Sequence, residues 1–262
     1  MTDDPCRPAV FSNGFAGMGG DGEQPVADRC RCLPVGRSPR RLRFHRERQD
    51  TSAPGWLRLL ELIEEAAADG REEFRPLTEL TAEQRRQVVT LPPTIGTLTG
   101  VRELVLYRSN LVRIPAEIGR MRSLEVFEPY TSYRLHWFPY ELARLPALRG
   151  STVSTRALYG NAKYRPGFPA LPGPVDGPAD LGALDPGVRG ATEVRACSVC
   201  DGPVVELRQA WISLHTSGHD VLPLLVNACS DACLASLPAP PEGYPPGWHR
   251  GGPEPVPPAR GR

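Results

Sequence analysis

The chain has 262 residues, among them 26 Gly and 30 Pro, and its formal net charge at pH 7 is +1. Such a Gly and Pro content predicts long stretches without regular structure, which leaves residues for small domains rather than one large one. A net charge this close to zero excludes a general electrostatic attraction to nucleic acid or to an anionic membrane surface.

The sequence contains no apolar run of about 18 residues, the length that predicts a transmembrane helix. Its N-terminus, MTDDPCRPAVFSNG, builds no apolar stretch of the kind that a signal peptide needs. We therefore expect a cytoplasmic protein without membrane contact. In a reducing compartment the seven cysteines are expected as thiols or metal ligands rather than as disulfides, and their odd number agrees.

Residues 1–50 show no apolar periodicity and are predicted to form a disordered leader. The run from Arg37 to Arg48 is compatible with a nucleic-acid contact arm. Its charges follow no aromatic or helical pattern, however, which favours a disordered segment rich in arginine.

Two helices are predicted next. In PGWLRLLELIEEAAADG the apolar residues recur at helical spacing, Pro54 suits the first turn and Gly70 suits a C-terminal cap. The face expected to be buried consists of Trp56, Leu59, Leu60, Ile63 and Ala67. A shorter helix is predicted in LTAEQRRQVV, where Thr81 and Gln84 have the spacing of a capping box.

A unit then recurs along the chain. Pro92, Pro115 and Pro139 follow one another at spacings of 23 and 24 residues, and a period of this length is typical of stacked short repeats. In the unit VRELVLYRSNLVRIPAEIGRM, Leu104 and Leu106 fall on one face of a short strand. The proline starts a second, convex segment.

These motifs resemble the leucine-rich repeat family, in particular its 23-residue class with a Pro-x-x-Ile convex segment, over residues 90–161. The resemblance implies an α+β fold with a short solenoid and an N-terminal helical cap at 56–89. Ser109 stands where the family prefers Asn. Pro129 stands where the second strand should have Leu, so that strand is expected to be irregular.

The resemblance also implies a concave face that binds an unidentified protein partner. Neighbouring repeats would stack Tyr107 beside Tyr130 and bring Arg108 near Glu128, and Tyr and Arg are common interface anchors. The alternative is a solvated polar face that only keeps the solenoid soluble. The candidate partner-binding residues are Glu103, Val105, Tyr107, Arg108, Val126, Glu128, Tyr130, Thr131, Thr152, Ser154 and Thr155.

The domain organisation follows from these segments. We expect the leader at 1–50, the helical cap and repeats at 51–164, a Pro/Gly linker at 165–190, a small zinc-stapled module at 191–238 and a disordered Pro/Gly tail at 239–262.

The small module contains CSVC and CSDAC, which supply Cys197, Cys200, Cys229 and Cys233. Two closely spaced thiolate pairs can meet around one zinc ion, and four protein ligands leave no open position, so the ion would be structural. The pattern resembles treble-clef zinc folds and the ending of TRASH- and MYM-type fingers. Cys6, Cys30 and Cys32 in the leader lack such spacing.

A rival ligand set is present, because His215 and His219 follow CSVC in HTSGH. Gly218 between them indicates a turn rather than the helix of a two-Cys, two-His finger, which favours the all-cysteine set. A metal enzyme would need His215, His219 and Asp220 around an open site. The sequence has no phosphate-binding glycine loop and no nucleophile elbow.

We therefore expect a non-enzymatic interaction scaffold. The alternative is a zinc-finger nucleic-acid-binding or regulatory protein, against which stand the few basic residues of the module, Arg195 and Arg208.

Overall fold

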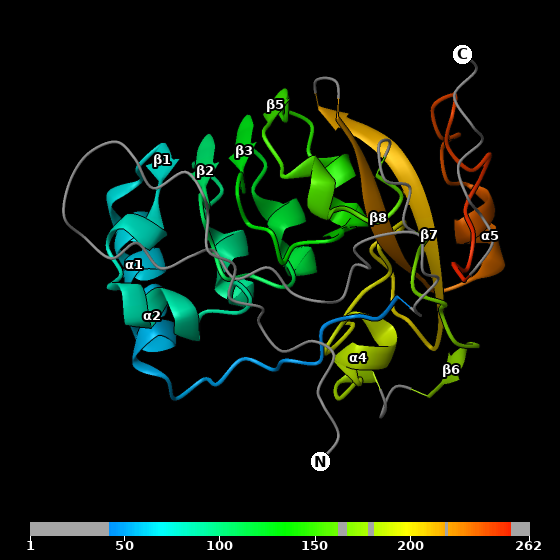
Figure 1. Cartoon of the computed structure of the whole chain (residues 1–262), viewed down its shortest axis with the longest axis horizontal. Coiled ribbons are helices and arrows are strands. Elements are labelled where there is room, and N and C mark those ends of the chain that lie inside the picture. Colours follow the sequence, from blue (N-terminus) through cyan, green and yellow to red (C-terminus); the bar gives the residue numbers. More distant parts are fainter. Residues whose placement is uncertain (1–41, 162–166, 178–180, 218–219, 253–262) are drawn as a thin grey trace, which may run out of the picture.

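The computed structural model describes residues 42–161, 167–177, 181–217 and 220–252. They form a mixed α/β fold in which a parallel sheet lies beside a second sheet built on a long hairpin (Figure 1). The leader up to residue 41, with its three cysteines, lies outside the described residues, as do His219 and the tail from residue 253. Among the described residues, no helix is both long and apolar enough to cross a membrane.

Helices α1 (Pro54–Asp69) and α2 (Ala82–Gln87) confirm the two predicted helices. Gly70 ends α1 in the left-handed conformation, with φ at 67°, a conformation that glycine adopts at little cost. The capping box of α2 is formed. Thr81 Oγ1 accepts a hydrogen bond from the Gln84 N–H at 3.2 Å, and Gln84 Oε1 accepts one from the Thr81 N–H at 2.9 Å.

The buried face of α1 is rotated slightly from the predicted one. Leu59 and Ile63 are buried as expected, and Leu62 joins them, whereas Ala67 is exposed. The rotation keeps an apolar stripe of ordinary width against the core.

The parallel sheet has four short strands in chain order: β1 (Glu73–Phe74), β2 (Glu103–Val105), β3 (Val126–Glu128) and β5 (Gly150–Ser151). Leu104 of β2 lies opposite Phe127 of β3, and Phe127 lies opposite Ser151 of β5. These partners are 23 and 24 residues apart, the same spacings as the recurrent prolines. Each recurrent unit therefore adds one strand to the sheet.

Pro129 limits the sheet as expected. The Leu106 N–H donates to the Glu128 carbonyl at 2.9 Å, which extends the contact between β2 and β3 past the strand ends. Pro129 occupies the position of Leu106 one unit later and has no N–H to donate toward β5. The pairing of β3 with β5 accordingly ends at Phe127 and Ser151.

Three 3-10 helices lie on the other side of the recurrent units: η2 (Pro93–Thr97), η3 (Ala116–Arg120) and η4 (Tyr140–Arg144). Each follows one of the recurrent prolines, whose φ angles of −72°, −74° and −71° are nearly identical. The proline ring fixes this angle and so directs the chain into each helix in the same way. Two further 3-10 helices are η1 (Pro76–Thr78) and η5 (Thr155–Ala157).

Glycine allows consecutive 3-10 helices to approach closely. A Cβ atom at Gly96 in η2 would lie 2.8 Å from the carbonyl oxygen of Glu117 in η3. A Cβ atom at Gly119 in η3 would lie 2.7 Å from the Cβ atom of Glu141 in η4. Only glycine fits both positions without displacing the neighbouring helix.

A pair of buried serines joins two units between the strands and the 3-10 helices. Ser109 Oγ and Ser132 Oγ lie 2.6 Å apart, and Ser132 Oγ also donates to the Leu106 carbonyl at 3.0 Å. The Ser109 N–H donates to the Leu106 carbonyl and to Ser132 Oγ.

The second sheet contains β4 (Phe138–Pro139), β8 (Asp220–Ala228), β7 (Glu206–Ser217) and β6 (Val175–Asp176), in that spatial order. β7 and β8 form the antiparallel hairpin, whereas β4 belongs to the last recurrent unit and pairs in parallel with β8. The same buried cluster extends from Leu59 in α1 to Leu234 in α5 (Asp231–Ala235). The repeats and the cysteine module therefore share one hydrophobic core.

The region predicted as a flexible linker differs from that expectation in its described residues. Phe168, Leu171, Leu181 and Leu184 are buried, and α4 (Pro186–Arg189) is a short helix capped by Asp185. The composition of this segment is typical of a linker, but these four leucine and phenylalanine side chains belong to the two buried cores.

Residues 42–50, which we call the strap, correct the prediction that the whole leader is disordered. In Figure 1 this blue segment passes beneath both parts of the molecule, from α4 to α1. Phe44 is buried and stacks on Trp211 of β7, with ring centroids 5.5 Å apart. His45 is buried as well and stacks on His136 at 5.2 Å.

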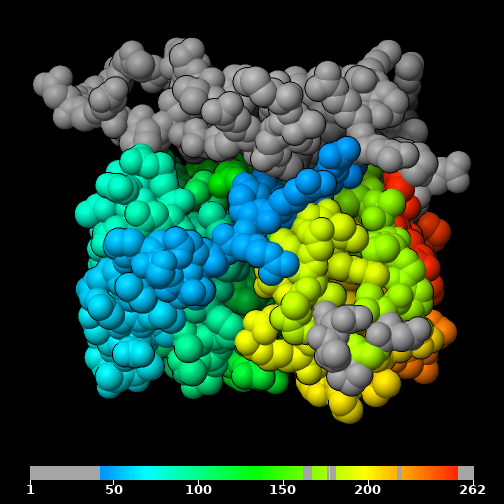
Figure 2. Space-filling view, turned by 90° about the horizontal axis from the view of Figure 1, so that it is seen from below, coloured from blue at the N-terminus to red at the C-terminus, as the bar shows by residue number. Residues whose placement is uncertain are grey.

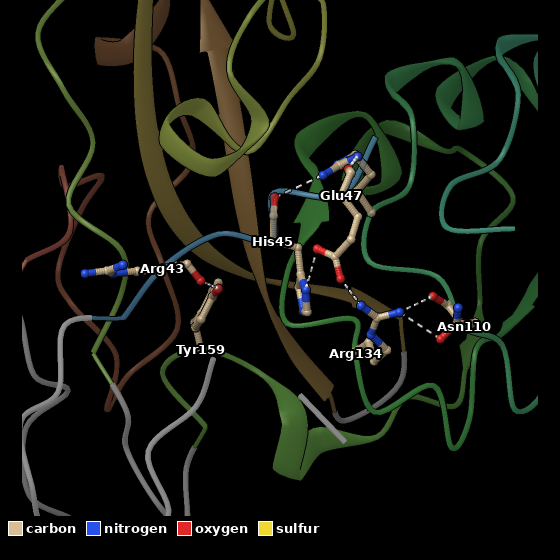
Figure 3. Close-up of polar contacts among 7 residues, drawn as sticks. Arg43, His45, Glu47, Asn110, Arg134 and Tyr159 are labelled. Atoms are coloured by element: carbon tan, nitrogen blue, oxygen red, sulfur yellow. Dashed lines mark hydrogen bonds and ion pairs between the residues drawn. The ribbon is translucent and has the colours of Figure 1, made fainter. Parts of the chain in front are cut away.

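Polar contacts fix the strap to the recurrent units (Figure 3). Glu47 Oε2 lies 3.2 Å from His45 Nδ1. The other carboxylate oxygen of Glu47 forms an ion pair with the buried Arg134. Arg134 also donates a hydrogen bond to Asn110 Oδ1 at 2.8 Å. Arg113 donates to the carbonyls of His45 and Glu47. The two bonds from Arg113 thus give partners to main-chain carbonyl groups of the strap.

We predict that Gly96→Ala destabilises the protein, whereas Gly100→Ala does not. The added methyl at residue 96 meets the Glu117 carbonyl, while nothing lies within 4 Å of a Cβ atom at Gly100. Overpacking of this kind costs about 1–3 kcal/mol. Urea unfolding of both variants measures the difference, and an equal stability of the two would show that the 3-10 helices do not pack as described.

The strap contact predicts a loss of stability in acid. Burial tends to raise the pKa of Glu47, but its hydrogen bond and charge interaction with His45 and the charge of Arg134 outweigh this and lower that pKa from 4.5 to about 2. A carboxyl with a depressed pKa stabilises the fold fully above its unfolded value, and this contribution is lost as the pH falls toward the folded value.

We therefore expect the free energy of unfolding to decrease between about pH 4.5 and pH 2, with a smaller decrease in Glu47→Gln. Urea titrations across this pH range provide the measurement, with Glu83→Gln, an exposed carboxyl in α2, as the control. Identical pH profiles for wild type and Glu47→Gln would contradict the role of this ion pair.

Candidate metal centre and partner surface

The four predicted cysteines come together at one end of the hairpin. All four sulfur atoms lie within 4.8 Å of one another, and they form a group that could hold one metal ion. Cys229 Sγ lies 3.7 Å from Cys200 Sγ and 3.6 Å from Cys233 Sγ. These separations exceed an S–S bond of about 2.05 Å by far, and all four are free thiols.

The hairpin explains why residues so distant in sequence meet here. Cys229 follows the last residue of β8, and Cys233 lies in α5, whose N-cap Ser230 accepts a hydrogen bond from the Cys233 N–H at 3.2 Å. The loop that carries Cys197 and Cys200 is held against the end of β8. There the Ser198 N–H donates to the Asn227 carbonyl at 2.8 Å, and the Asn227 N–H donates to Ser198 Oγ at 3.0 Å.

Backbone groups also prepare the site for thiolate ligands. The N–H groups of Val199 and Cys229 both point to Cys197 Sγ, at 3.4 Å, and such donors stabilise negative charge on sulfur. Hydrogen bonding by the Cys233 thiol and burial raise the pKa of the Cys229 thiol to about 12. A cation that binds here must therefore displace protons.

The donor set fits zinc. Tetrahedral coordination with Zn–S bonds of about 2.3 Å requires sulfur atoms about 3.8 Å apart, close to the 3.6 and 3.7 Å separations of Cys229 from its neighbours. Four soft thiolates and no water position are typical of a structural rather than a catalytic ion.

The rival ligand His215 lies at the opposite end of the hairpin. It pairs with Val221, whereas Cys229 follows Ala228, which pairs with Arg208. Seven residues along a strand span about 23 Å, so His215 cannot replace a cysteine ligand. His219 falls outside the described residues.

The cysteine loop is fixed to the 3-10 helix η4. Arg144 in η4 donates to the Ser198 carbonyl and to Asp201 Oδ1, both at 2.8 Å, and forms a second bond to the same carboxylate. The hydrogen bond from the Arg144 side chain is the main cause that lowers the pKa of the Asp201 carboxyl. Sequence reasoning did not identify this contact, because no local pattern relates η4 to a loop more than 50 residues away.

The predicted stack of Tyr107 on Tyr130 is confirmed. The ring centroids lie 6.1 Å apart with an interplanar angle of 31°, and the side chains are 50% and 47% exposed. The Arg108 N–H donates to the Tyr130 carbonyl at 3.0 Å. Arg108 and Thr131 both adopt left-handed backbone conformations, with φ at 57° and 60°, so the same turn follows each strand.

The other predicted partner-binding residues differ in exposure. Arg108, Thr152 and Thr155 are exposed, and Glu103, Val126, Glu128 and Thr131 are half-buried. Val105 and Ser154 are buried, which corrects the expectation that they face outward. Strand alternation placed both outside. Val105 is instead a buried end residue of β2, and Ser154 lies beyond β5, where it is the N-cap residue of η5.

A scan against protein-family models and a search of curated proteins both find no match to this sequence.

We predict that the purified chain binds about one zinc ion, that Cys233→Ser loses it, and that the matched variant Cys30→Ser/Cys32→Ser retains it. Metal loss should lower the melting temperature by more than about 5 °C, because metal affinity adds to folding stability. Elemental analysis and thermal unfolding are the measurements. Zinc retained by Cys233→Ser but lost from His215→Ala would favour the rival ligand set.

Proposed function

We propose that the recurrent units form a short leucine-rich-repeat solenoid and that the chain is a non-enzymatic scaffold for protein–protein interaction. Three features support the assignment of the repeats: strand partners 23 and 24 residues apart, a proline before each 3-10 helix, and a buried Ser109–Ser132 pair where the family has Asn. The helices α1 and α2 would be its N-terminal cap.

The single observation that carries the binding proposal is the exposed pair Tyr107 and Tyr130. Both rings remain about half exposed although they stack on each other, and neither belongs to a buried core cluster. Aromatic side chains at the ends of the strands of a rigid sheet lose little conformational entropy on binding, and they are frequent interface anchors. Beside them, Arg108, Thr131 and Thr152 supply polar groups for a rim.

In this proposal the four cysteines hold zinc for stability. The ion would supply only coordination bonds that fix the loop of Cys197 and Cys200 to the end of β8. A site without an open coordination position carries no hydrolytic chemistry, in agreement with a scaffold rather than an enzyme. The partner is expected to be a protein of the same compartment, which we expect to be the cytoplasm.

The test uses the zinc-loaded chain as bait in a cell extract, with and without nuclease. We expect a protein that is retained after nuclease treatment and lost with Tyr107→Ala/Tyr130→Ala. The matched control is Leu57→Ala, which removes a 47% exposed side chain from α1 and should leave retention unchanged.

The nucleic-acid alternative gives the opposite pattern. Capture that disappears with nuclease and survives the loss of both tyrosines would overturn the proposal. The two tyrosines should account for about 2 kcal/mol or more of binding, which is a loss of retention of about 30-fold.

A further inference from the structure

A cleft of about 710 Å³ separates the 3-10 helices from the cysteine module. It is lined by η3 and η4 on one side, by residues 190–197 on the other and by part of the strap. Figure 2 shows this hollow from below, between the teal repeat segment and the yellow segment that leads to the cysteines. The proposed partner surface at the strand ends does not contribute to it.

The cleft carries an excess of positive charge. Arg120, Arg122 and Arg144 line the cleft together with a single aspartate, Asp201. Only Arg144 is bonded to that carboxylate. Arg120 and Arg122 make no side-chain hydrogen bond or ion pair with any described residue. The lining thus holds one aspartate beside these three arginines, and two of the arginines have no side-chain acceptor in the part of the chain that the structure describes.

Arg113 adds a third cation to the cleft wall without an acidic partner bonded to it. Arg113 is a buried residue, 5% exposed, and its guanidinium donates to the carbonyls of His45 and Glu47. Burial lowers the pKa of this group to about 10. By contrast, Arg195 on the opposite wall is neutralised by Glu117 and Glu193. The uncompensated charge is therefore on the side of the 3-10 helices.

A buried polar atom in the same cleft lacks a partner. Glu141 in η4 is 9% exposed and lines the cleft, and its Oε2 atom has no hydrogen-bond partner among the residues that the structure describes. A carboxyl oxygen left buried without a partner destabilises the folded state. A hydroxyl or amine group of a bound molecule would satisfy it.

We propose that this cleft binds a small organic anion, with a phosphate or carboxylate group held by Arg120 and Arg122 and a hydrogen-bond donor placed against Glu141. Arginine is well suited to the anionic group because its planar fork donates two parallel hydrogen bonds. A volume of several hundred Å³ is typical of small-molecule sites. The loop of Cys197 to Asp201 forms part of the rim, so metal binding and ligand binding act on the same segment.

Calorimetry on the zinc-loaded full chain tests this inference. The probes are glycerol 3-phosphate, which carries phosphate and hydroxyl groups, citrate, which carries carboxylate and hydroxyl groups, and neutral glycerol. We expect saturable, salt-sensitive binding of at least one anion and none of glycerol. Which anion binds identifies the preferred acid group.

The double variant Arg120→Ala/Arg122→Ala should weaken this binding by about tenfold or more, because it removes both charge-assisted contacts. Its control, Arg86→Ala/Arg156→Ala, removes two exposed arginines that do not line the cleft and should bind as wild type. Thermal unfolding verifies that both variants are folded.

Glu141→Leu separates the two halves of the site. It should leave inorganic phosphate binding unchanged and reduce the preference for glycerol 3-phosphate over inorganic phosphate. The inference is overturned if neither anion binds, or if both arginine double variants lose affinity equally, since that would indicate only a general attraction to positive charge.

Discussion

The pairing of β4 with β8 is the constraint on which the rest of the structure depends. A stack of strands leaves an open apolar end, and here the last recurrent unit ends by placing Phe138 opposite Leu224 of the hairpin. The buried cluster consequently continues without interruption into the cysteine module. Four short strands and their 3-10 helices would be a small stack on their own, and the hairpin covers the apolar end of this stack.

Two further contacts hold the same junction from different sides. Phe44 of the strap packs against both Trp137 and Trp211, and so joins the segment before β4 to β7. On the other side Arg144 bonds to Asp201 beside the cysteines. Because metal coordination would fix the loop of Asp201, it would also fix one rim of the cleft. The cysteine group, the cleft and the stack are therefore connected, while the exposed tyrosine pair lies on the stack at the ends of β2 and β3 and does not line the cleft.

Features encoded by local spacing could be predicted from the sequence. The caps of α1 and α2, the strand partners at the proline period and the cysteine group all depend on residue types at short, regular intervals. What escaped prediction depends on distant partners. Leu42 and Phe44 alternate with arginines, which is a weak strand signal, but they pack in a cluster that is built around Trp211. The buried apolar residues of the predicted linker likewise pack against segments that are distant in sequence. Glu141 and Arg120 were unremarkable in sequence because only the folding of η3 and η4 against the cysteine loop makes them neighbours.

The central claim is that the parallel sheet and the hairpin with its cysteines unfold as one cooperative unit. The most direct test is amide hydrogen exchange of the chain with and without zinc. If they do, removal of zinc should reduce amide protection at Leu106 and Phe127 in the parallel sheet as well as in β7 and β8, because global opening limits exchange in a shared core. Protection that falls in the hairpin alone, with the parallel sheet unchanged, would show that the two parts are independent domains and would contradict the account.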